Sequence, residues 1–394
     1  MHTDTCRLLV LLWLMSTVLI TPQRTSAATY LYPDLKTLRP RDLQFARADI
    51  DPTSAVNIHN VLRFTNTVWN AGPGRMEIWS TINPSTHKGT AYQRVYDTSG
   101  SYTQYAVGTL YYHDAPGHMH YHFDNWGKYQ LWTRADYDKW IASGRTQGQA
   151  KKVGTKATAC ILDGEFVQTR TGTPYPGKYP FSGCQPNSHN VIKEGISIGW
   201  GDTYDYYLFE QWIDLGQEWL SDGDYVLRSV TDPLNKLYES ANKALASRDS
   251  VQANEGVTFF SVQDGKLVDT RRPSGTVRIN DVAASTTSVY VTVKVLGRDD
   301  VAGVDRLRLS NNGTSWKTYT YSAPAPGTSV SIPTAVSWNL ADPSAGGNSS
   351  SGTKTVYVQT HDRAAKWSPT FTDQIVLKAA TSLTSYGLIA ALTH

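Results

Sequence analysis

Alternation of apolar and polar residues marks many short segments of this chain as β-strands. In Ser288–Val295, a valine stands at every second position and Tyr, Thr and Lys stand between them. Successive side chains of a strand point to opposite faces, so this segment is predicted to be a half-buried strand. Val61–Ile78, Tyr129–Trp132 and Gly223–Val230 are β-prone runs separated by turn residues. The pattern therefore predicts an all-β protein.

Helical patterns are short and few. Arg134–Arg145 and Tyr238–Ser247 are the segments that favour helices. Near Pro273 the pattern changes to repeated strands with turn signals and no helical stretch, which is typical of a β-sandwich. The expected organisation is a signal peptide at 1–27, a first domain at 29–268, a sandwich at 273–380 and a C-terminal tail at 381–394.

The expected sandwich contains recognisable hairpin signals. Asp305–Trp316 reads as a strand, an Asn-Gly turn and a second strand, and Thr353–Asp362 as another strand. With "RINDVAA", "LRLSNNGTSW" and "KTVYVQTHDRAAKWSP", the region resembles the immunoglobulin-like modules appended to secreted bacterial enzymes.

The N-terminus has the pattern of a secretory signal peptide. Arg7 precedes the apolar run Leu8–Ile20, and small residues suited to cleavage stand near Ala27 and Ala28. The run is too short to span a membrane, and no other apolar stretch approaches about 18 residues. We therefore expect a secreted protein without a membrane span.

Composition and charge agree with an extracellular protein. The chain has 23 Tyr and 12 Trp but only 18% charged residues, a balance that suits strands. Its net charge of +3 is not gathered into a basic stripe, so we expect no nucleic-acid partner. Cys6 lies in the expected signal peptide, which leaves Cys160 and Cys184 as an even pair in an oxidising compartment.

The candidate chemistry begins with "GHMHYHFDNW", which places His118, His120 and His122 one residue apart. In a strand, all three imidazoles share a face and can turn toward one metal ion. Imidazole suits copper, zinc, iron and nickel, and the absence of nearby carboxylate or thiolate ligands favours copper. The competing interpretations are a histidine-rich surface and a zinc hydrolase, the latter without a glutamate base close by.

Six strings then occur in the order of the lysyl oxidase catalytic domain, which the chain resembles over roughly residues 30–260. They are "YPDL", "LRF", "HMHYHF", "GTKATACILD", "GWGDTYDYYLFEQWIDL" and "GDYVLRSVTDP". The resemblance implies that His118, His120 and His122 bind one copper ion. It also implies a lysine tyrosylquinone made from Lys156, in the Gly-x-Lys-Ala-x-x-Cys string, and Tyr204, in the Asp-Thr-Tyr string.

Two further residues belong to the candidate site or lie near it in the sequence. Asp202 stands two residues before Tyr204 and is the candidate general base, with a turn-stabilising aspartate as the alternative. His113 is interpreted as a surface residue in preference to a partner of the metal ligands.

The function implied by the resemblance is oxidation of peptidyl lysine or other primary amines by O2 to aldehydes, with release of H2O2 and ammonia. The alternative is a non-catalytic secreted protein that binds copper or attaches to a surface. The chain departs from the animal enzymes in offering one disulfide at most, in a longer segment between Asp163 and Gly199, and in the appended sandwich.

Overall fold

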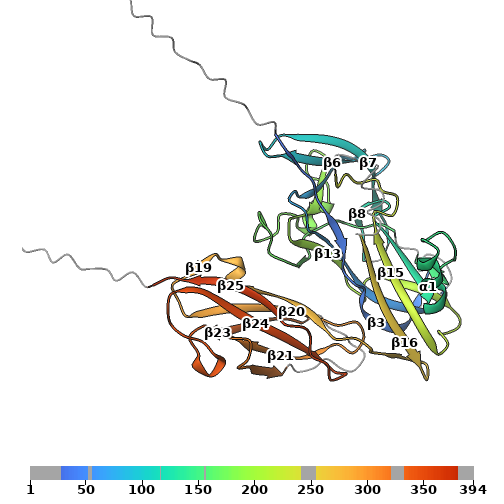
Figure 1. Cartoon of the computed structure of the whole chain (residues 1–394). Coiled ribbons are helices and arrows are strands. Elements are labelled where there is room, and N and C mark those ends of the chain that lie inside the picture. The colour runs from blue at the N-terminus through green and yellow to red at the C-terminus, as the bar shows by residue number, and fades with distance from the viewer. Residues whose placement is uncertain are drawn as a thin grey trace, which may run out of the picture.

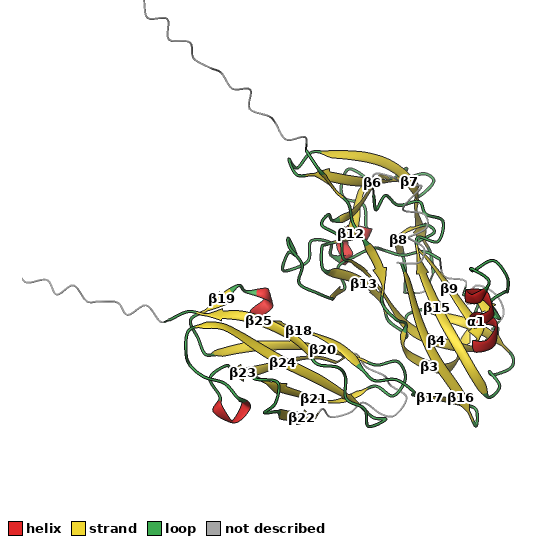
Figure 2. Ribbon diagram, in the orientation of Figure 1, coloured by secondary structure: helices red, strands yellow, loops and turns green. Residues whose placement is uncertain are grey.

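The structure, a computed structural model, describes residues 28–51, 56–115, 117–154, 157–240, 254–320 and 332–379. Nearly all regular structure in these ranges is β-strand (Figure 2). The protein is all-β, which confirms the fold class expected from the alternating pattern. The expected signal peptide at 1–27 and the tail at 381–394 lie outside the described residues.

Strands between residues 30 and 268 form three sheets, which we call the first lobe (Figure 1). The first sheet has the order β12-β5-β6-β7-β8 with β1 beside β6, and the second has the order β10-β9-β15-β16-β17. The third has the order β11-β13-β4-β14, with β2 and β3 also paired to β4. The strands are β1 (Tyr30–Leu31), β2 (Leu35–Thr37), β3 (Arg41–Asp49), β4 (Ile58–Asn70), β5 (Met76–Thr81), β6 (Lys88–Asp97), β7 (Tyr102–His113), β8 (His120–Phe123), β9 (Gly127–Thr133), β10 (Lys152–Val153), β11 (Glu165–Phe166), β12 (Val191–Ile196), β13 (Trp200–Tyr204), β14 (Trp212–Gly216), β15 (Gly223–Thr231), β16 (Glu255–Gln263) and β17 (Lys266–Val268).

Strands from residue 274 onward form two further sheets, the second lobe, at the lower left of Figure 1. Their orders are β18-β20-β23 and β19-β25-β24-β21-β22. Val291, Val293 and Val295 are buried between these sheets, as their alternation predicts. The strands are β18 (Ser274–Ile279), β19 (Ser285–Thr286), β20 (Tyr290–Arg298), β21 (Val304–Ser310), β22 (Lys317–Thr320), β23 (Ile332–Asn339), β24 (Gly352–Asp362) and β25 (Phe371–Leu377).

Helices are minor elements. The predicted helix at Arg134–Arg145 is observed as α1 (Arg134–Ala142), and the Thr133 hydroxyl accepts a hydrogen bond from the Asp136 N–H at its N-cap. Of the predicted helix Tyr238–Ser247, residues 238–240 are not helical and 241–247 lie outside the described residues. The short 3₁₀ helices are η1 (Phe181–Cys184), η2 (Asn280–Val282) and η3 (Pro343–Ala345). No helix in the described ranges is long and apolar enough to cross a membrane.

The two largest apolar clusters among the described residues of the first lobe position the candidate site. One includes Leu62 and Phe64 of β4 with Leu131 of β9 and Leu227 of β15. The other includes residues of β5–β8 together with Tyr204 of β13. The second core therefore brings β13 close to the sheet whose terminal strand, β8, carries two of the candidate histidines.

Candidate metal and tyrosine site

The three candidate histidines do not share one strand. β8 begins at His120, so His120 and His122 lie on the strand, whereas His118 lies in the turn before it. Met119 has a φ of 43°, in the left-handed region, and this breaks the extended alternation. The prediction of three imidazoles on one strand face is therefore wrong for His118, which the turn orients instead.

The three imidazoles nevertheless converge, and all three residues are buried. His120 Nε2 lies 3.0 Å from His122 Nε2, and His118 Nδ1 lies 3.3 Å from the same His122 atom. Two nitrogens that each lie about 2 Å from one metal ion are themselves roughly 3 Å apart. The spacing of these donors is thus compatible with a shared transition-metal ion, and imidazole nitrogen suits copper.

A fourth imidazole joins this group. His113, at the end of β7, pairs with His120 across the ladder, and its Nδ1 lies 3.1 Å from His122 Nδ1. Its ring stacks on His118 with a centroid distance of 4.5 Å, and its Nε2 lies 3.8 Å from a Glu210 carboxylate oxygen. The preference for His113 as a surface residue is therefore wrong: it is half-buried and lies in the histidine cluster.

Tyr204 ends β13 and is buried. Its hydroxyl accepts a hydrogen bond from the backbone N–H of Cys160 at 2.7 Å and lies 3.3 Å from the Cys160 carbonyl oxygen. Burial raises the pKa of the Tyr204 phenol well above its ordinary value, and the nearby Asp202 charge raises it further. The unmodified phenol is thus held neutral at physiological pH.

Asp202 lies on the same strand as Tyr204, two residues earlier, so both side chains point to one face. It is only 2% exposed and stands in the middle of a strand, which excludes the turn-stabilising role. Asp202 is therefore a buried carboxylate on the same strand face as the Tyr204 phenol.

The segment 157–160 connects the histidines to Tyr204. The backbones of Ala159 and Phe123 exchange two hydrogen bonds, 2.7 and 3.2 Å long, which extend the sheet beyond β8. Thr158 Oγ1 lies 2.9 Å from His122 Nδ1, and Cys160 contacts Tyr204 as described above. Lys156 itself lies outside the described residues, immediately before this segment.

Two residues of this region, Thr158 and Glu194, were not predicted from the sequence. Thr158 stands two positions after Lys156 inside the matched string, and that proximity is the signal that would have indicated it. Glu194 is fully buried on β12, accepts a hydrogen bond from the Ile161 N–H at 2.9 Å, and has a pKa raised well above its usual range by burial. No local pattern distinguishes Glu194 from an ordinary strand residue.

Cys160 and Cys184 form a disulfide, with an S–S distance of 1.95 Å. The bond joins the segment that contacts Tyr204 to η1, whose Phe181 ring lies against His120 with a centroid distance of 4.9 Å. The pairing expected from the cysteine count therefore supports both halves of the site.

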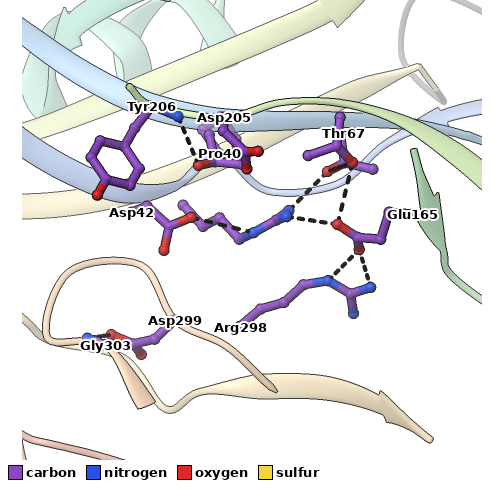
Figure 3. A network of polar contacts seen from close by, with 12 residues as sticks. Pro40, Asp42, Thr67, Glu165, Asp205, Tyr206, Arg298, Asp299 and Gly303 are labelled. Carbon is purple, nitrogen blue, oxygen red and sulfur yellow. Dashed lines mark hydrogen bonds and ion pairs between the residues drawn. The ribbon is translucent and has the colours of Figure 1, made fainter. Parts of the chain in front are cut away.

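A buried ion network around Glu165 connects β13 to Arg298 of the second lobe (Figure 3). Glu165 of β11 accepts hydrogen bonds from Arg41 Nη2 and from Arg298 Nε, both at 2.7 Å. Its Oε2 also lies 3.2 Å from the hydroxyl of Thr203, the residue between Asp202 and Tyr204. The second lobe thus reaches the strand that carries the candidate site.

Two hollows flank this network, with volumes of about 610 and 560 Å³. Arg41 and Val277 line both of them, so each hollow lies between the lobes. None of the candidate histidines lines either hollow, and neither does Tyr204.

No protein-family model and no curated protein matches this chain. One solved structure is described as a tetra-tandem repeat in the extending region of a large adhesion protein. The alignment covers 89% of this chain and 75% of the adhesion-protein chain. The identity is 10% and the TM-score 0.20, a likeness too weak to carry an argument about fold or function.

Proposed function

We propose that this protein is a secreted amine oxidase that uses copper and a lysine tyrosylquinone derived from Lys156 and Tyr204. Its substrates would be peptidyl lysine or other primary amines, with O2 as the oxidant. One observation carries the proposal: the segment 157–160, which directly follows Lys156, contacts His122 at Thr158 and Tyr204 at Cys160. The histidine cluster, a buried phenol and the chain next to the lysine therefore lie close together, which supports the proposal.

The donor set fits copper. His113, His118 and His122 each offer a ring nitrogen within 4.8 Å of the other two, and His120 Nε2 lies 3.0 Å from His122 Nε2. The Glu210 carboxylate lies beside this group, 3.8 Å from His113 Nε2. Copper bound there would supply one-electron chemistry with O2, and the quinone would supply an electrophilic carbonyl for the amine.

The residues of the chain have separate tasks in this scheme. The backbone N–H of Cys160 fixes the Tyr204 oxygen, and the disulfide at Cys160 holds that backbone in place. The Asp202 carboxylate would accept the proton that leaves the substrate carbon. Burial of the site excludes water, which strengthens the interaction between Asp202 and a positively charged substrate nitrogen.

The direct test is a crosslink search in copper-loaded protein. Proteolysis should yield one species that contains the Lys156 and Tyr204 peptides and survives disulfide reduction. Tyr204→Phe should retain copper but lose the crosslink, the visible quinone band and at least 100-fold of amine-dependent H2O2 release, because the phenol oxygen is the atom oxidised.

Tyr207→Phe is the matched control, since Tyr207 lies three residues away and is 64% exposed. It should leave the crosslink and the activity unchanged. Copper uptake without a crosslink or reactivity toward phenylhydrazine would favour the alternative, a copper-binding protein without catalysis.

A further inference from the structure

Three buried aspartates converge where the two lobes meet, far from the histidine cluster in sequence. Asp269 follows β17 in the segment that connects the lobes, Asp299 follows β20, and Asp362 ends β24. One carboxylate oxygen from each residue lies within 4.8 Å of the other two. The group thus joins the connecting segment to both sheets of the second lobe.

Each carboxylate is anchored through one of its oxygens. Asp299 Oδ2 accepts two backbone N–H groups, at 2.8 and 3.1 Å. Asp362 Oδ1 and Asp269 Oδ1 each accept one, at 2.8 and 2.9 Å respectively. The second oxygens, Asp269 Oδ2, Asp299 Oδ1 and Asp362 Oδ2, are buried and have no hydrogen-bond partner within the described part of the chain. The backbone therefore fixes the orientation of three carboxylates and leaves one acceptor of each unsatisfied.

Burying three carboxylates close together costs free energy unless a cation compensates their charge. The side chain of Asp269 is 4% exposed, Asp299 is 3% exposed and Asp362 is fully buried. Burial raises the pKa of Asp299 above its usual range, and repulsion from Asp269 adds to the effect. The Lys366 ammonium lies 3.3 Å from Asp269 Oδ1, and its charge also acts on Asp362. One ammonium leaves most of the charge of three buried carboxylates uncompensated.

The neighbouring Asp300 shows the contrast. It is also buried, but two guanidinium groups approach its carboxylate, Arg39 at 3.5 Å and Arg271 at 4.0 Å. Asp300 Oδ2 also lacks a hydrogen-bond partner within the described ranges, but two guanidinium groups offset its charge. The three-aspartate group has one ammonium, that of Lys366, within 4 Å in the same ranges.

We propose that Asp269, Asp299 and Asp362 form a calcium site that fixes the connecting segment against the second lobe. The donors are all oxygens, which suit a hard cation and not copper. Ca²⁺ binds oxygen at about 2.4 Å, so ligands on opposite sides of one ion lie up to about 4.8 Å apart. Backbone carbonyls and water would complete the 6 to 8 ligands that Ca²⁺ takes.

The site has a mechanical consequence for the lobes. The backbone carbonyls of Asp299 and Asp300 accept hydrogen bonds from the N–H groups of Asp42 and Leu43 on β3, at 3.2 and 2.8 Å. The loop that supplies Asp299 is therefore also a contact with the first lobe. Calcium bound there would hold the connecting segment and this contact together, and so would fix the relative orientation of the lobes.

Calcium binding can be measured on the mature full chain after treatment with a chelator. Isothermal titration with Ca²⁺ should give one equivalent bound, and Ca²⁺ should raise the melting temperature by several degrees. Mg²⁺ at the same concentration should have a smaller effect, because it demands shorter, near-octahedral coordination. Asp299→Asn together with Asp362→Asn should abolish the calcium response.

The control is Asp281→Asn, which alters a carboxylate of the same lobe that already has the Lys294 ammonium 2.8 Å away. It should bind calcium normally. Hydrogen exchange of the unaltered protein, with and without Ca²⁺, locates the site even if the double variant fails to fold: amides at 299–303 and 362–366 should gain protection. Absence of calcium binding, unchanged binding in a folded double variant, or protection confined to other segments would overturn the proposal.

Discussion

Glu165 is the residue whose loss should most weaken the contact between the lobes. Its carboxylate is buried between the guanidinium groups of Arg41 and Arg298, one from each lobe (Figure 3). Burial alone would raise the pKa of Glu165, but the two guanidiniums outweigh this effect and hold the pKa below its usual range. The network is therefore electrostatically favourable as long as the carboxylate carries its charge.

Glu165→Gln preserves the shape of the side chain and removes the charge. Both guanidinium groups then lose their closest anion while still buried, and uncompensated buried charges typically cost 3–5 kcal/mol. Asp42 remains 3.6 Å from Arg41 Nε, which offsets part of this cost. We therefore expect the free energy of unfolding to fall by about 3 kcal/mol.

The assay is urea unfolding, at neutral pH, of the chain without residues 1–27, followed by tryptophan fluorescence. Arg298→Met should cost less than Glu165→Gln, because Glu165 keeps its 2.7 Å contact with Arg41. The double variant should cost less than the sum of the single ones by about 1–3 kcal/mol, the coupling expected for residues in contact.

Asp281→Asn supplies the control, since it breaks an ion pair to Lys294 in which both side chains are 34% exposed. Exposed pairs contribute about 0–1 kcal/mol. If Glu165→Gln cost no more than this control, the network would not be a determinant of stability.

Truncation near Pro273 should preserve amine oxidation, because the matched strings lie upstream, but it removes Arg298. Glu165→Gln should then cost less in the truncated chain than in the full one.

Two further predictions concern single side chains. His113→Ala and His120→Ala should both lower copper content as measured by atomic absorption, because both rings lie in the histidine cluster; full copper in either variant would remove that residue from the ligand set. Glu239 is half-buried, and desolvation raises the pKa of its carboxyl group from 4.5 to about 7. Its contribution to stability is therefore complete below pH 4.5 and is lost as pH rises through 7, by about 3 kcal/mol in all. Glu239→Gln should reduce this loss, as measured by urea unfolding at pH 4.5 and 8; an unchanged difference between the two pH values would contradict the assignment. The Asn254 amide, which donates to Glu239 at 2.8 Å, can rotate to accept from the new glutamine.

Local patterns were sufficient for the strands and for part of the site. Period-2 alternation correctly identified the valines of β20, and the short helix after Thr133 carries its capping residue in the sequence. The histidine motif identified three residues whose side chains do converge. Strand periodicity wrongly placed His118 on the strand, whereas it lies in the turn before β8. The left-handed backbone conformation of Met119 depends on the turn that precedes β8, and the hydrophobic pattern of the sequence does not predict it.

Contacts between distant segments could not be predicted because they depend on how the sheets pack. In the sequence, His113 looks like an ordinary polar residue at the end of a strand. It lies opposite His120 because of the register between β7 and β8. Glu165 and Arg298 are 133 positions apart and meet only when the lobes are in contact. Strand alternation then links this contact to the candidate chemistry, because Thr203 faces Glu165 while Asp202 and Tyr204 face the other side. A substitution at the lobe contact should therefore change stability, because Glu165 and Arg298 are buried, without touching the Asp202 and Tyr204 side chains on the other face of β13.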